Sequence, residues 1–278
     1  MSALASVRFL VADGFNLIRR IFEARQGASD DLSEVIAACR ASLRRALLAH
    51  KPSHAAVVLE HHDATWRHLL YPDYKADRPP PPAALLDGLP QFTEAFADEG
   101  VKTTAAHNYE ADDVIATLAS GVAARQGKVI ILSTDKLFLQ LLAPGIEIID
   151  HFNNKKLDSE HVKARYGVSV ESFVDYLALV GDRSVNLKGV PGIGDKAARQ
   201  LLERFGSLEQ LLASSAVTDD KSLETKRQKV LDSADEANRC RQLCTLKRDV
   251  ELGDNLRHFR LQSSAGQRQK AEQQRAGQ

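Results

Sequence analysis

Short apolar runs alternate with longer amphipathic stretches through the first half of the chain. The runs that predict strands are 7–13, 54–60, 101–106, 128–134 and 147–150. The stretches that predict helices are 32–50, 85–99 with an interruption near Pro90, and 111–126, whereas 61–82 is irregular. Strands that alternate with helices in this way favour an α/β fold with a mainly parallel sheet flanked by helices.

The pattern changes near residue 158, where helical stretches joined by short glycine-containing turns replace the alternation. Helices are expected at 173–180, at 196–205 and from residue 208 onward. We therefore expect a catalytic α/β region over 1–157 and a helical region over 158–262. Residues 263–278 have almost no apolar content and are expected to form a disordered tail.

The overall charge does not by itself predict nucleic-acid binding, because 37 basic and 37 acidic residues among 278 leave a formal net charge of zero. Positive charge is in excess over 183–204 and 221–229, within the helical region. The three cysteines form no framework typical of secretion. No signal peptide is apparent, and no apolar run approaches the ~18 residues of a membrane span. We therefore expect a cytoplasmic protein.

Acidic residues stand where the expected strands end. Asp13, Glu60 and Asp135 follow three apolar runs, and the acids of Glu110–Asp113 open an expected helix. Sites in open α/β sheets form beyond the carboxyl ends of the strands, so up to six carboxylates would meet in one crevice. Such carboxylates repel one another unless they are protonated or bind cations. Oxygen ligands without nearby cysteine favour Mg²⁺ or Mn²⁺, so the pattern predicts a metal-dependent phosphoryl-transfer site.

Each acid taken singly is more typical of a turn or a helix cap, since acids in a first helical turn suit the helix dipole. Only their joint placement favours metal binding.

Two further segments favour contact with nucleic acid. Residues 66–78 combine aromatic and cationic side chains, which can stack on bases, contact phosphates and polarise a phosphoryl oxygen. A solvated loop with aromatic anchors is an equally good interpretation of this composition. Residues 189–196 place three glycines before Lys196 and Arg199, as in a helix–hairpin–helix that contacts DNA backbone without reading bases. An ordinary glycine-rich turn is the alternative, and the spacing does not match a dinucleotide-binding motif.

In combination these motifs resemble the 5′ nuclease family, which includes the N-terminal domain of bacterial DNA polymerase I, phage 5′ nucleases and flap endonucleases. The matching stretches, in the family's order, are Leu10–Gly14, Tyr74–Pro80, Glu110–Asp113, Ser133–Lys136 and Gly189–Gly194. They extend the resemblance over roughly residues 7–262. Asn16–Ile21 is similar to the stand-alone bacterial branch of the family.

The resemblance implies a PIN-like core, an arch over the active site at about 61–99, and a helix–three-turn–helix DNA clamp. The first metal site would comprise Asp13, Glu60, Glu110 and Asp112. The second would comprise Asp112, Asp113, Asp135 and Asp182. Lys75 and Arg78 would contact the scissile phosphate and act with Asp13 and Asp112 in catalysis. The expected DNA-binding residues are Arg19, Arg20, Arg67, Tyr74, Gly189, Val190, Gly192, Ile193, Gly194, Lys196 and Arg199. A potassium ion is implied at the hairpin.

Three positions depart from the family pattern. Glu60 stands where an aspartate is usual, and Leu137 and Val185 replace two expected ligands of the second metal. Two-metal displacement needs ions about 3.5–4 Å apart, so the second site is expected to be weak.

The predicted function is a Mg²⁺-dependent, structure-specific nuclease that cuts 5′ flaps or branched DNA, acting as a monomer without a small-molecule cofactor. One alternative is a DNA-junction binding protein with vestigial nuclease activity, which the two apolar replacements suggest. A PIN-type ribonuclease is a third interpretation, against which the hairpin region argues.

Overall fold

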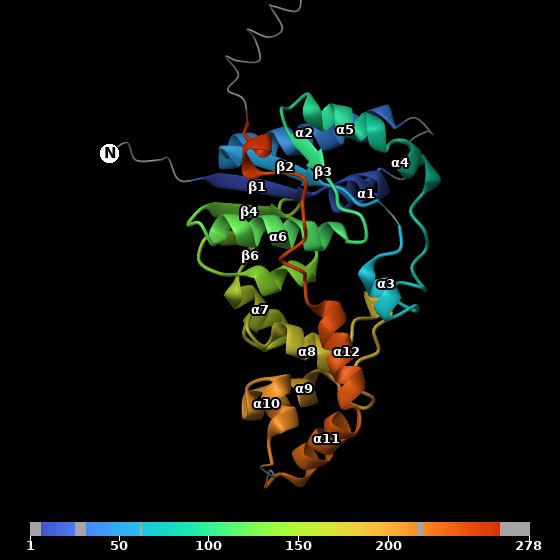
Figure 1. The fold of residues 1–278 in the computed structure, drawn as a ribbon, viewed down its shortest axis with the longest axis vertical. Coiled ribbons are helices and arrows are strands. Elements are labelled where there is room, and N and C mark those ends of the chain that lie inside the picture. Colours follow the sequence, from blue (N-terminus) through green and yellow to red (C-terminus); the bar gives the residue numbers. More distant parts are fainter. Residues whose placement is uncertain (1–6, 26–31, 62, 216–218, 262–278) are drawn as a thin grey trace, which may run out of the picture.

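The computed structural model describes residues 7–25, 32–61, 63–215 and 219–261 (Figure 1). The expected tail at 263–278 lies outside the described residues. Six strands form one sheet in the order β3-β2-β1-β4-β5-β6. Their bounds are β1 Arg8–Asp13, β2 His54–Val58, β3 Lys102–Thr104, β4 Lys128–Leu132, β5 Ile146–Asp150 and β6 Lys155–Leu157. All neighbouring pairs are parallel except β5 with β6. The expected mainly parallel sheet is confirmed.

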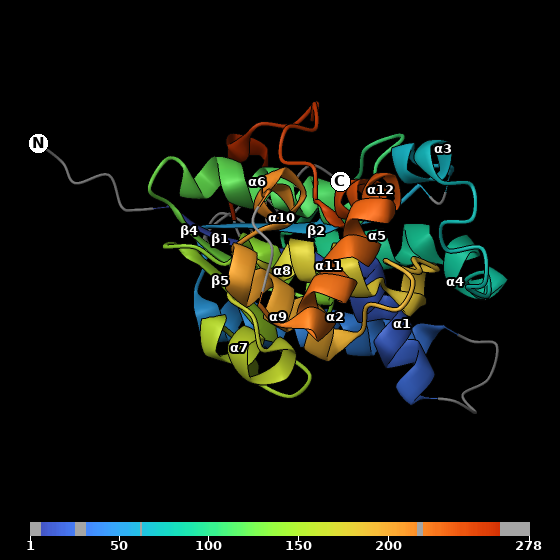
Figure 2. The same cartoon turned by 90° about the horizontal axis from the view of Figure 1, so that it is seen from below.

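Helices cover both faces of this sheet, as Figure 2 shows for α6 above the strands and α1 and α2 below them. One face packs on α1 Gly14–Ala24, α2 Ser33–His50, α4 Ala83–Asp87 and α5 Leu89–Ala97, and the other on α6 Ala111–Ala123. Along β1, Leu10 faces the first group of helices whereas Phe9 and Val11 face the second. This alternation follows from the period of two in strand side chains and explains why the buried strands read as continuous apolar runs.

The strand order reverses at β1, because the chain proceeds from β1 to β2 and β3 on one side and later to β4 and β5 on the other. The connections that leave β1 and β4 therefore diverge and open a crevice at the carboxyl edge of the sheet. Asp13 ends β1 at this point, and Asp135 lies three residues beyond the end of β4. The topology thus places two of the predicted acids beside the same crevice.

A helical region extends below the sheet in Figure 1. It contains α7 Ser159–Tyr166, α8 Phe173–Val180, α9 Asp195–Phe205, α10 Leu208–Ala213, α11 Lys221–Asp232 and α12 Ala234–Cys244, with the short 3₁₀ turn η2 Arg183–Val185. Another 3₁₀ turn, η1 Lys136–Leu141, lies between β4 and β5. After α12 the chain returns to the sheet, where the turn η3 Leu256–Phe259 places Phe259 against Phe9 with ring centroids 5.8 Å apart. The last part of the region expected at 158–262 therefore packs on the α/β core.

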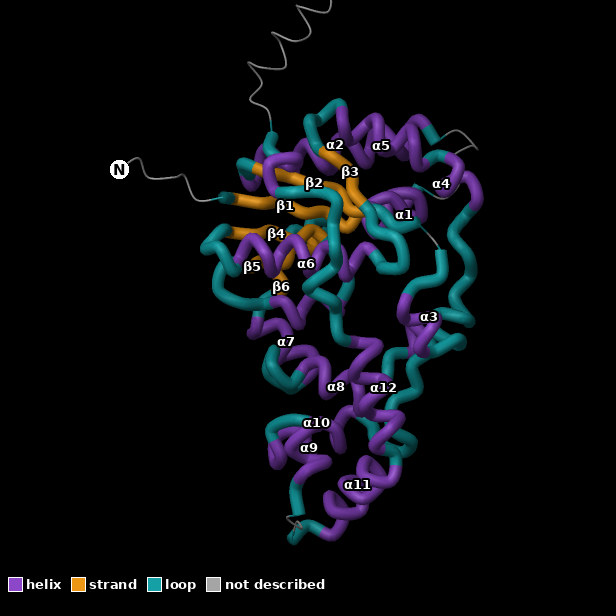
Figure 3. The backbone as a smooth tube through the Cα atoms, in the orientation of Figure 1, coloured by secondary structure: helices purple, strands orange, loops and turns teal. Residues whose placement is uncertain are grey.

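The segment between β2 and α4 leaves the body of the sheet and approaches the helical region (Figures 1 and 3). It contains the short helix α3 Trp66–Leu70 and then loops and turns. Leu85, Phe92 and Phe96, in the helices that follow, are fully buried against the sheet. The part of the expected arch that lies outside the sheet and its covering helices is therefore about 63–82, although Arg67 and Tyr74 within it are buried. Residues 83–99 instead pack as core helices, because their apolar stripe needs a buried surface.

Helix α1 was not anticipated by the sequence pattern, which placed the first helix at 32–50. It begins directly after β1, with the Asp13 carboxylate accepting a hydrogen bond from the backbone N–H of Asn16 as its N-cap. Gly14 permits this abrupt turn, because a Cβ there would lie 2.7 Å from the carbonyl oxygen of Val58. Among the described residues, no helix is both long and apolar enough to cross a membrane.

Candidate nuclease active site

Four of the predicted acids line one cleft of about 350 Å³ at the carboxyl edge of the sheet. We call this the acidic cleft and define it by Asp13, Glu60, Asp112 and Asp135. Basic side chains from two other elements share its wall, namely Arg19 and Arg20 from α1 and Lys75 and Arg78 from the 63–82 segment. The sequence correctly placed acids from three strand ends and one helix start together.

Local backbone geometry orients the acids that follow β1 and β4. The second oxygen of Asp13 accepts a hydrogen bond from Ser133 Oγ at 2.9 Å, across the two central strands. Asp135 caps the turn η1 by accepting from the backbone N–H of Leu137 at 2.7 Å. Capping explains why aspartate rather than glutamate suits both positions, since the short side chain returns to its own backbone. Each carboxylate keeps acceptor capacity beyond these bonds.

The three aspartates of the cleft hold protons more tightly than usual. Burial raises the pKa of Asp13 to about 7, with the negative charges of Glu60 and Asp135 adding to the rise and hydrogen bonds from Asn16 and Ser133 opposing it. Burial also raises the pKa of Asp112 well above its usual value, helped by Asp135 and Asp13. The pKa of Asp135 is raised as well, chiefly by burial. A divalent cation would offset the burial and mutual repulsion of these carboxylates, because it favours the charged form of each acid.

The donor set of the cleft fits Mg²⁺ better than a metal that needs a closed protein cage. The acidic groups supply only oxygen ligands, which Mg²⁺ and Mn²⁺ prefer. Among the described residues, no three His, Cys, Asp or Glu side chains already converge as a ready-made metal-binding group. Mg²⁺ commonly keeps several waters and takes one or two carboxylates together with substrate phosphate. The cleft therefore suits a partly hydrated ion.

Glu110 lies beside the cleft rather than on its wall. It is 3% exposed, and its carboxylate accepts from Lys75 Nζ at 2.5 Å, Tyr74 Oη at 3.1 Å and Arg67 Nη1 at 3.2 Å. Burial alone would raise the pKa of Glu110, but the charges of Lys75 and Arg67 outweigh it and lower the pKa. Glu110 is therefore ionised and firmly oriented.

Lys75 connects Glu110 to the cleft. Its backbone has a φ of 57°, a left-handed conformation that is uncommon for a lysine, and its N–H donates to the carbonyl of Val185 at 3.0 Å. Such strain persists only where the surroundings enforce it, and it is common at functional sites. Burial would lower the pKa of Lys75, but the charges of Glu110, Glu60 and Asp112 raise it, so the ammonium stays protonated. Arg78 is exposed and lines the same cleft.

Asp182, an expected ligand of the second metal, is paired with a lysine. Lys136 Nζ lies 2.8 Å from its Oδ1, and Ser184 donates to the same oxygen from both N–H and Oγ, at 3.0 and 2.7 Å. Leu137 and Val185 form an apolar part of the adjoining cleft wall. The ammonium of Lys136 thus supplies positive charge where the second metal was expected, a role that the sequence did not suggest.

Two expected roles do not fit the observed placement. Asp113 is fully buried and does not line the acidic cleft, because its carboxylate is bound by Arg67 at 2.7 and 2.9 Å. Arg67 is 0% exposed, so its guanidinium is not available to DNA phosphates. Tyr74 is 2% exposed and donates its hydroxyl to Glu110, which leaves no open ring face for base stacking. Metal binding by Asp113 and DNA binding by Arg67 and Tyr74 are corrected accordingly, because all three side chains are used inside the core.

The glycine-rich hairpin joins α8 to α9 by way of η2. Gly181 and Gly189, with φ values of 80° and 64°, approach so closely that a Cβ on Gly189 would lie 2.4 Å from the backbone nitrogen of Gly181. Only glycine fits this contact. Other members of the expected DNA-binding set divide by burial: Gly192, Gly194 and Lys196 are exposed, Arg199 is half-buried, and Val190 and Ile193 are buried. The two apolar side chains support the hairpin from inside, so a DNA contact of Val190 or Ile193 would come from backbone groups.

Some residues that line the cleft had no assigned role in the sequence interpretation, and two of them interact with each other. Asn16 and Thr134 line the acidic cleft and are hydrogen-bonded to each other, with Nδ2 3.1 Å from Oγ1. Arg20, an expected DNA-binding residue, also donates to Thr134 Oγ1 at 3.0 Å. The Ser133–Thr134 pair before Asp135 was the available signal, since polar residues at a strand end face the same crevice.

Comparisons with known proteins agree with this fold and cleft. Residues 8–167 match the family of the 5′-3′ exonuclease N-terminal resolvase-like domain, and residues 168–267 match the 5′-3′ exonuclease C-terminal SAM fold. The flap endonuclease Xni of Aeromonas hydrophila subsp. hydrophila is 41% identical over 256 residues, covering 90% of this chain and 94% of the relative. The flap endonuclease Xni of Psychromonas ingrahamii is 38% identical over 259 residues, covering 92% of this chain and 97% of the relative.

Among solved structures, the bacteriophage T5 flap endonuclease in a complex with DNA and metal ions has a similar fold. Its TM-score is 0.69 at 19% identity, over 85% of this chain and 88% of that chain. The two family matches together span nearly the whole sequence. The chain therefore belongs to the 5′-3′ exonuclease family. The relatives named above place it with the Xni-type nucleases of that family.

Proposed function

We propose that this protein is a Mg²⁺-dependent, structure-specific 5′ nuclease that hydrolyses phosphodiester bonds in DNA with 5′ flaps or related branches. The observation that carries the proposal is the acidic cleft at the carboxyl edge of the sheet, whose wall also includes Lys75 and Arg78. The flap endonuclease relatives and the DNA complex of the T5 enzyme support the substrate class.

Asp13, Glu60, Asp112 and Asp135 would surround the partly hydrated ion, with one or two of them as direct ligands, and Glu110 would add charge from behind the cleft wall. When bound, Mg²⁺ supplies an activated water and neutralises negative charge that develops on the phosphoryl group. Lys75 and Arg78 would bind the non-bridging oxygens of the phosphate and orient it, as preorganised cations do in phosphoryl transfer.

We further infer that one ion is held strongly in the absence of DNA. Leu137 and Val185 offer no ligands, and Lys136 already neutralises part of the charge on Asp182. A second divalent ion would meet repulsion from the ammonium of Lys136 and find few oxygen ligands.

The hairpin is proposed to hold duplex DNA by its backbone. Exposed Gly192 and Gly194 allow a phosphate to approach the start of α9 closely, and Lys196 stands in the first turn of that helix. Contacts of this kind carry no base sequence, so selectivity would come from DNA shape. A potassium ion at this hairpin stays a prediction.

We infer that the protein acts as a monomer in the cytoplasm. All groups assigned to the cleft and hairpin come from a single chain. Cys39, Cys240 and Cys244 are free and buried, which suits a reducing compartment.

Substrate choice tests the proposed function directly. With Mg²⁺, the protein should cleave a labelled 5′-flap DNA at least about tenfold faster than a matched 3′-flap or an unstructured RNA, an effect of more than ~1.4 kcal/mol on the barrier. Rates are measured in single turnover with the same duplex arms in each DNA. Tight flap binding without cleavage would instead favour the junction-binding protein, and preferential cutting of the RNA would favour a ribonuclease.

Metal affinity should depend on pH in a direction set by Asp13. Its pKa of about 7 means that a proton must leave before a cation can bind at pH 6, whereas at pH 8 the carboxylate is already charged. Apparent Mn²⁺ affinity should therefore rise roughly tenfold from pH 6 to pH 8. Isothermal titration without DNA measures both this change and the number of ions bound.

Asp13→Asn is the matched control for that titration, because it removes one of the three carboxyl groups whose pKa is raised but keeps the size of the side chain. Its Mn²⁺ binding should be weak and less dependent on pH. Equal affinity of the unchanged protein at both pH values would contradict the assigned protonation. Two tightly bound ions per chain would contradict the weak second site.

A further inference from the structure

The carboxylate of Asp113 is completely enclosed by donors. Its Oδ1 accepts from Arg67 Nη2 and from the backbone N–H of Lys247, each at 2.9 Å. Its Oδ2 accepts from Arg67 Nη1 at 2.7 Å and from Trp66 Nε1 at 3.0 Å. Asp113 and Arg67 are both 0% exposed. The bidentate fork of the guanidinium gives this pair a fixed geometry that a lysine could not reproduce.

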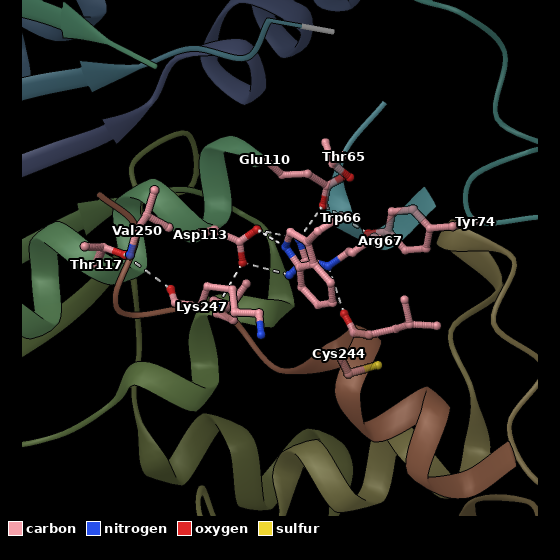
Figure 4. Close-up of polar contacts among 12 residues, drawn as sticks. Thr65, Trp66, Arg67, Tyr74, Glu110, Asp113, Thr117, Cys244, Lys247 and Val250 are labelled. Carbon is pink, nitrogen blue, oxygen red and sulfur yellow. Dashed lines mark hydrogen bonds and ion pairs between the residues drawn. The ribbon is translucent and has the colours of Figure 1, made fainter. Parts of the chain in front are cut away.

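The guanidinium of Arg67 also contacts two further elements besides Asp113 (Figure 4). Nη1 also reaches Glu110 Oε2 at 3.2 Å, and Nε donates to the carbonyl of Leu243 at 2.9 Å. Arg67 belongs to α3, Glu110 precedes α6, and Leu243 lies near the end of α12. One buried side chain therefore joins the 63–82 segment, the helix that carries Asp112, and the helical region.

Glu110 depends on this segment for its orientation. All three of its side-chain donors, from Arg67, Tyr74 and Lys75, lie within residues 66–75. The neighbouring Trp66 ring lies 4.4 Å from the guanidinium carbon of Arg67 and 4.7 Å from Lys247 Nζ. These two cation–π contacts, from Arg67 and Lys247, hold the indole in place. Replacing Asp113 or Arg67 would therefore alter the orientation of the Glu110 carboxylate and the surroundings of the Trp66 indole.

We propose that Arg67 and Asp113 form a positioning clamp that fixes Glu110 and Lys75 against the acidic cleft and thereby sets the affinity of the cleft for its divalent ion. The inference deepens the proposed function and rests on it. Arg67 and Asp113 are positioning residues here, because neither lines the cleft. Groups that orient metal ligands in this way typically change metal affinity or activity by ~10–100-fold when replaced.

A buried ion pair can also be a purely structural link between segments, so the variants must separate the two roles. Removing one partner alone leaves an uncompensated buried charge and destabilises the fold. Arg67→Lys keeps the positive charge but loses the fork. The double variant Arg67→Met with Asp113→Leu removes both charges and leaves apolar side chains. Together these variants keep the test usable if one of them folds poorly.

Arg40→Lys is the matched control. Arg40 also binds two carboxylates, Asp98 at 3.0 Å and Glu99 at 2.6 Å, but it links α2 to the end of α5, remote from the cleft. Its replacement should alter the melting temperature slightly and leave ion binding unchanged.

The experiment titrates the full chain and its variants with Mn²⁺ by calorimetry without DNA, well below each melting temperature. Arg67→Lys and the double variant should bind Mn²⁺ about 10–100-fold more weakly than the unchanged chain or Arg40→Lys. Trp66 is the only tryptophan in the chain, so its emission reports on the clamp without any label. Mg²⁺ should shift this emission in the unchanged chain and in Arg40→Lys, and should not do so in the Arg67 variants.

A lower melting temperature with Mn²⁺ affinity within twofold of the unchanged chain would overturn the clamp and leave a structural link only. Ion binding by the unchanged chain without any flap cleavage would refute the proposed nuclease but not the clamp. Failure of the unchanged chain to bind Mn²⁺ would refute both.

Discussion

Flap cleavage by an Asp112→Asn variant is expected to fall roughly 10³-fold, while binding of flap DNA stays equal or becomes tighter. Asp112 lies in the first turn of α6 and on the wall of the acidic cleft, where Asp135, Asp13 and Glu110 surround it. Unlike Asp13, Asp135 and Glu110, Asp112 makes no capping or side-chain hydrogen bond within the part of the chain that the structure describes. Its carboxylate is therefore the group most dependent on a cation for compensation.

The expected magnitude follows from the charge that the variant removes. A divalent ion contributes several kcal/mol to stabilising developing charge, and each 1.36 kcal/mol is a factor of ten in rate. Losing about 4 kcal/mol of this stabilisation gives a fall of roughly 10³. DNA binding should not suffer, because asparagine removes a negative charge from a cleft that must receive phosphate. The variant should also be as stable as the unchanged chain or more so without metal, since it relieves repulsion among the acids.

Single-turnover cleavage of labelled 5′-flap DNA in Mg²⁺ checks the rate, and binding of the same DNA in EDTA checks affinity. Asp235→Asn is the matched control, because Asp235 is likewise the second residue of its helix, follows an alanine and is exposed on α12. Its cleavage rate should match that of the unchanged chain. A rate for Asp112→Asn within tenfold of the unchanged chain would remove Asp112 from the ion-binding set.

Replacing Lys75 by alanine is expected to lower the cleavage rate about 10²-fold with saturating metal and DNA. Lys75 is the cation placed between Glu110 and the acidic cleft, and its strained backbone and short contact with Glu110 show that its position is enforced. A preorganised cation stabilises charge that grows on the phosphate, so its loss should reduce the maximal rate more than DNA affinity. Lys75→Arg should recover part of the rate, since it keeps the charge but not the geometry.

The control for Lys75 is Lys156→Ala, which removes an exposed lysine paired with Glu147 on the sheet edge opposite β3. Its rate should be unchanged. Comparing maximal rate with half-saturating DNA concentration separates the two possible roles of Lys75. An unchanged maximal rate with weaker DNA binding would make Lys75 a binding residue and not a catalytic one.

Several features of the site followed from local sequence because they depend on local rules. Asp13 and Asp135 cap the structures that follow their strands, and capping favours a short polar side chain such as aspartate. The parallel order of the strands then brings such ends to a single edge. The sequence also showed that Leu137 and Val185 replace expected metal ligands, since the absence of an oxygen ligand follows from residue type alone.

Other features could not be predicted from the sequence because they depend on contacts between distant segments. Arg67 was expected to contact DNA, but it is buried and donates instead to the carbonyl of Leu243 and to Asp113. Both partners are far from Arg67 in the sequence. The segment expected to form the arch, at about 61–99, includes Phe92 and Phe96, whose burial could not be predicted because it depends on β1 and α2. Helix α1 was missed because it follows its strand without a loop, and its helical period was not separated from the apolar run before it.

The sequence by itself determined the α/β architecture, the acids at the strand ends, the hairpin glycines and the family, because hydrophobic period, capping and motif spacing are encoded in neighbouring residues. Only the tertiary structure decided which charged side chains face the cleft and which face one another. Asp112 and Asp113 are adjacent in the chain, yet successive helix positions point in different directions. One carboxylate lines the acidic cleft, while the other is enclosed by Arg67, Trp66 and Lys247.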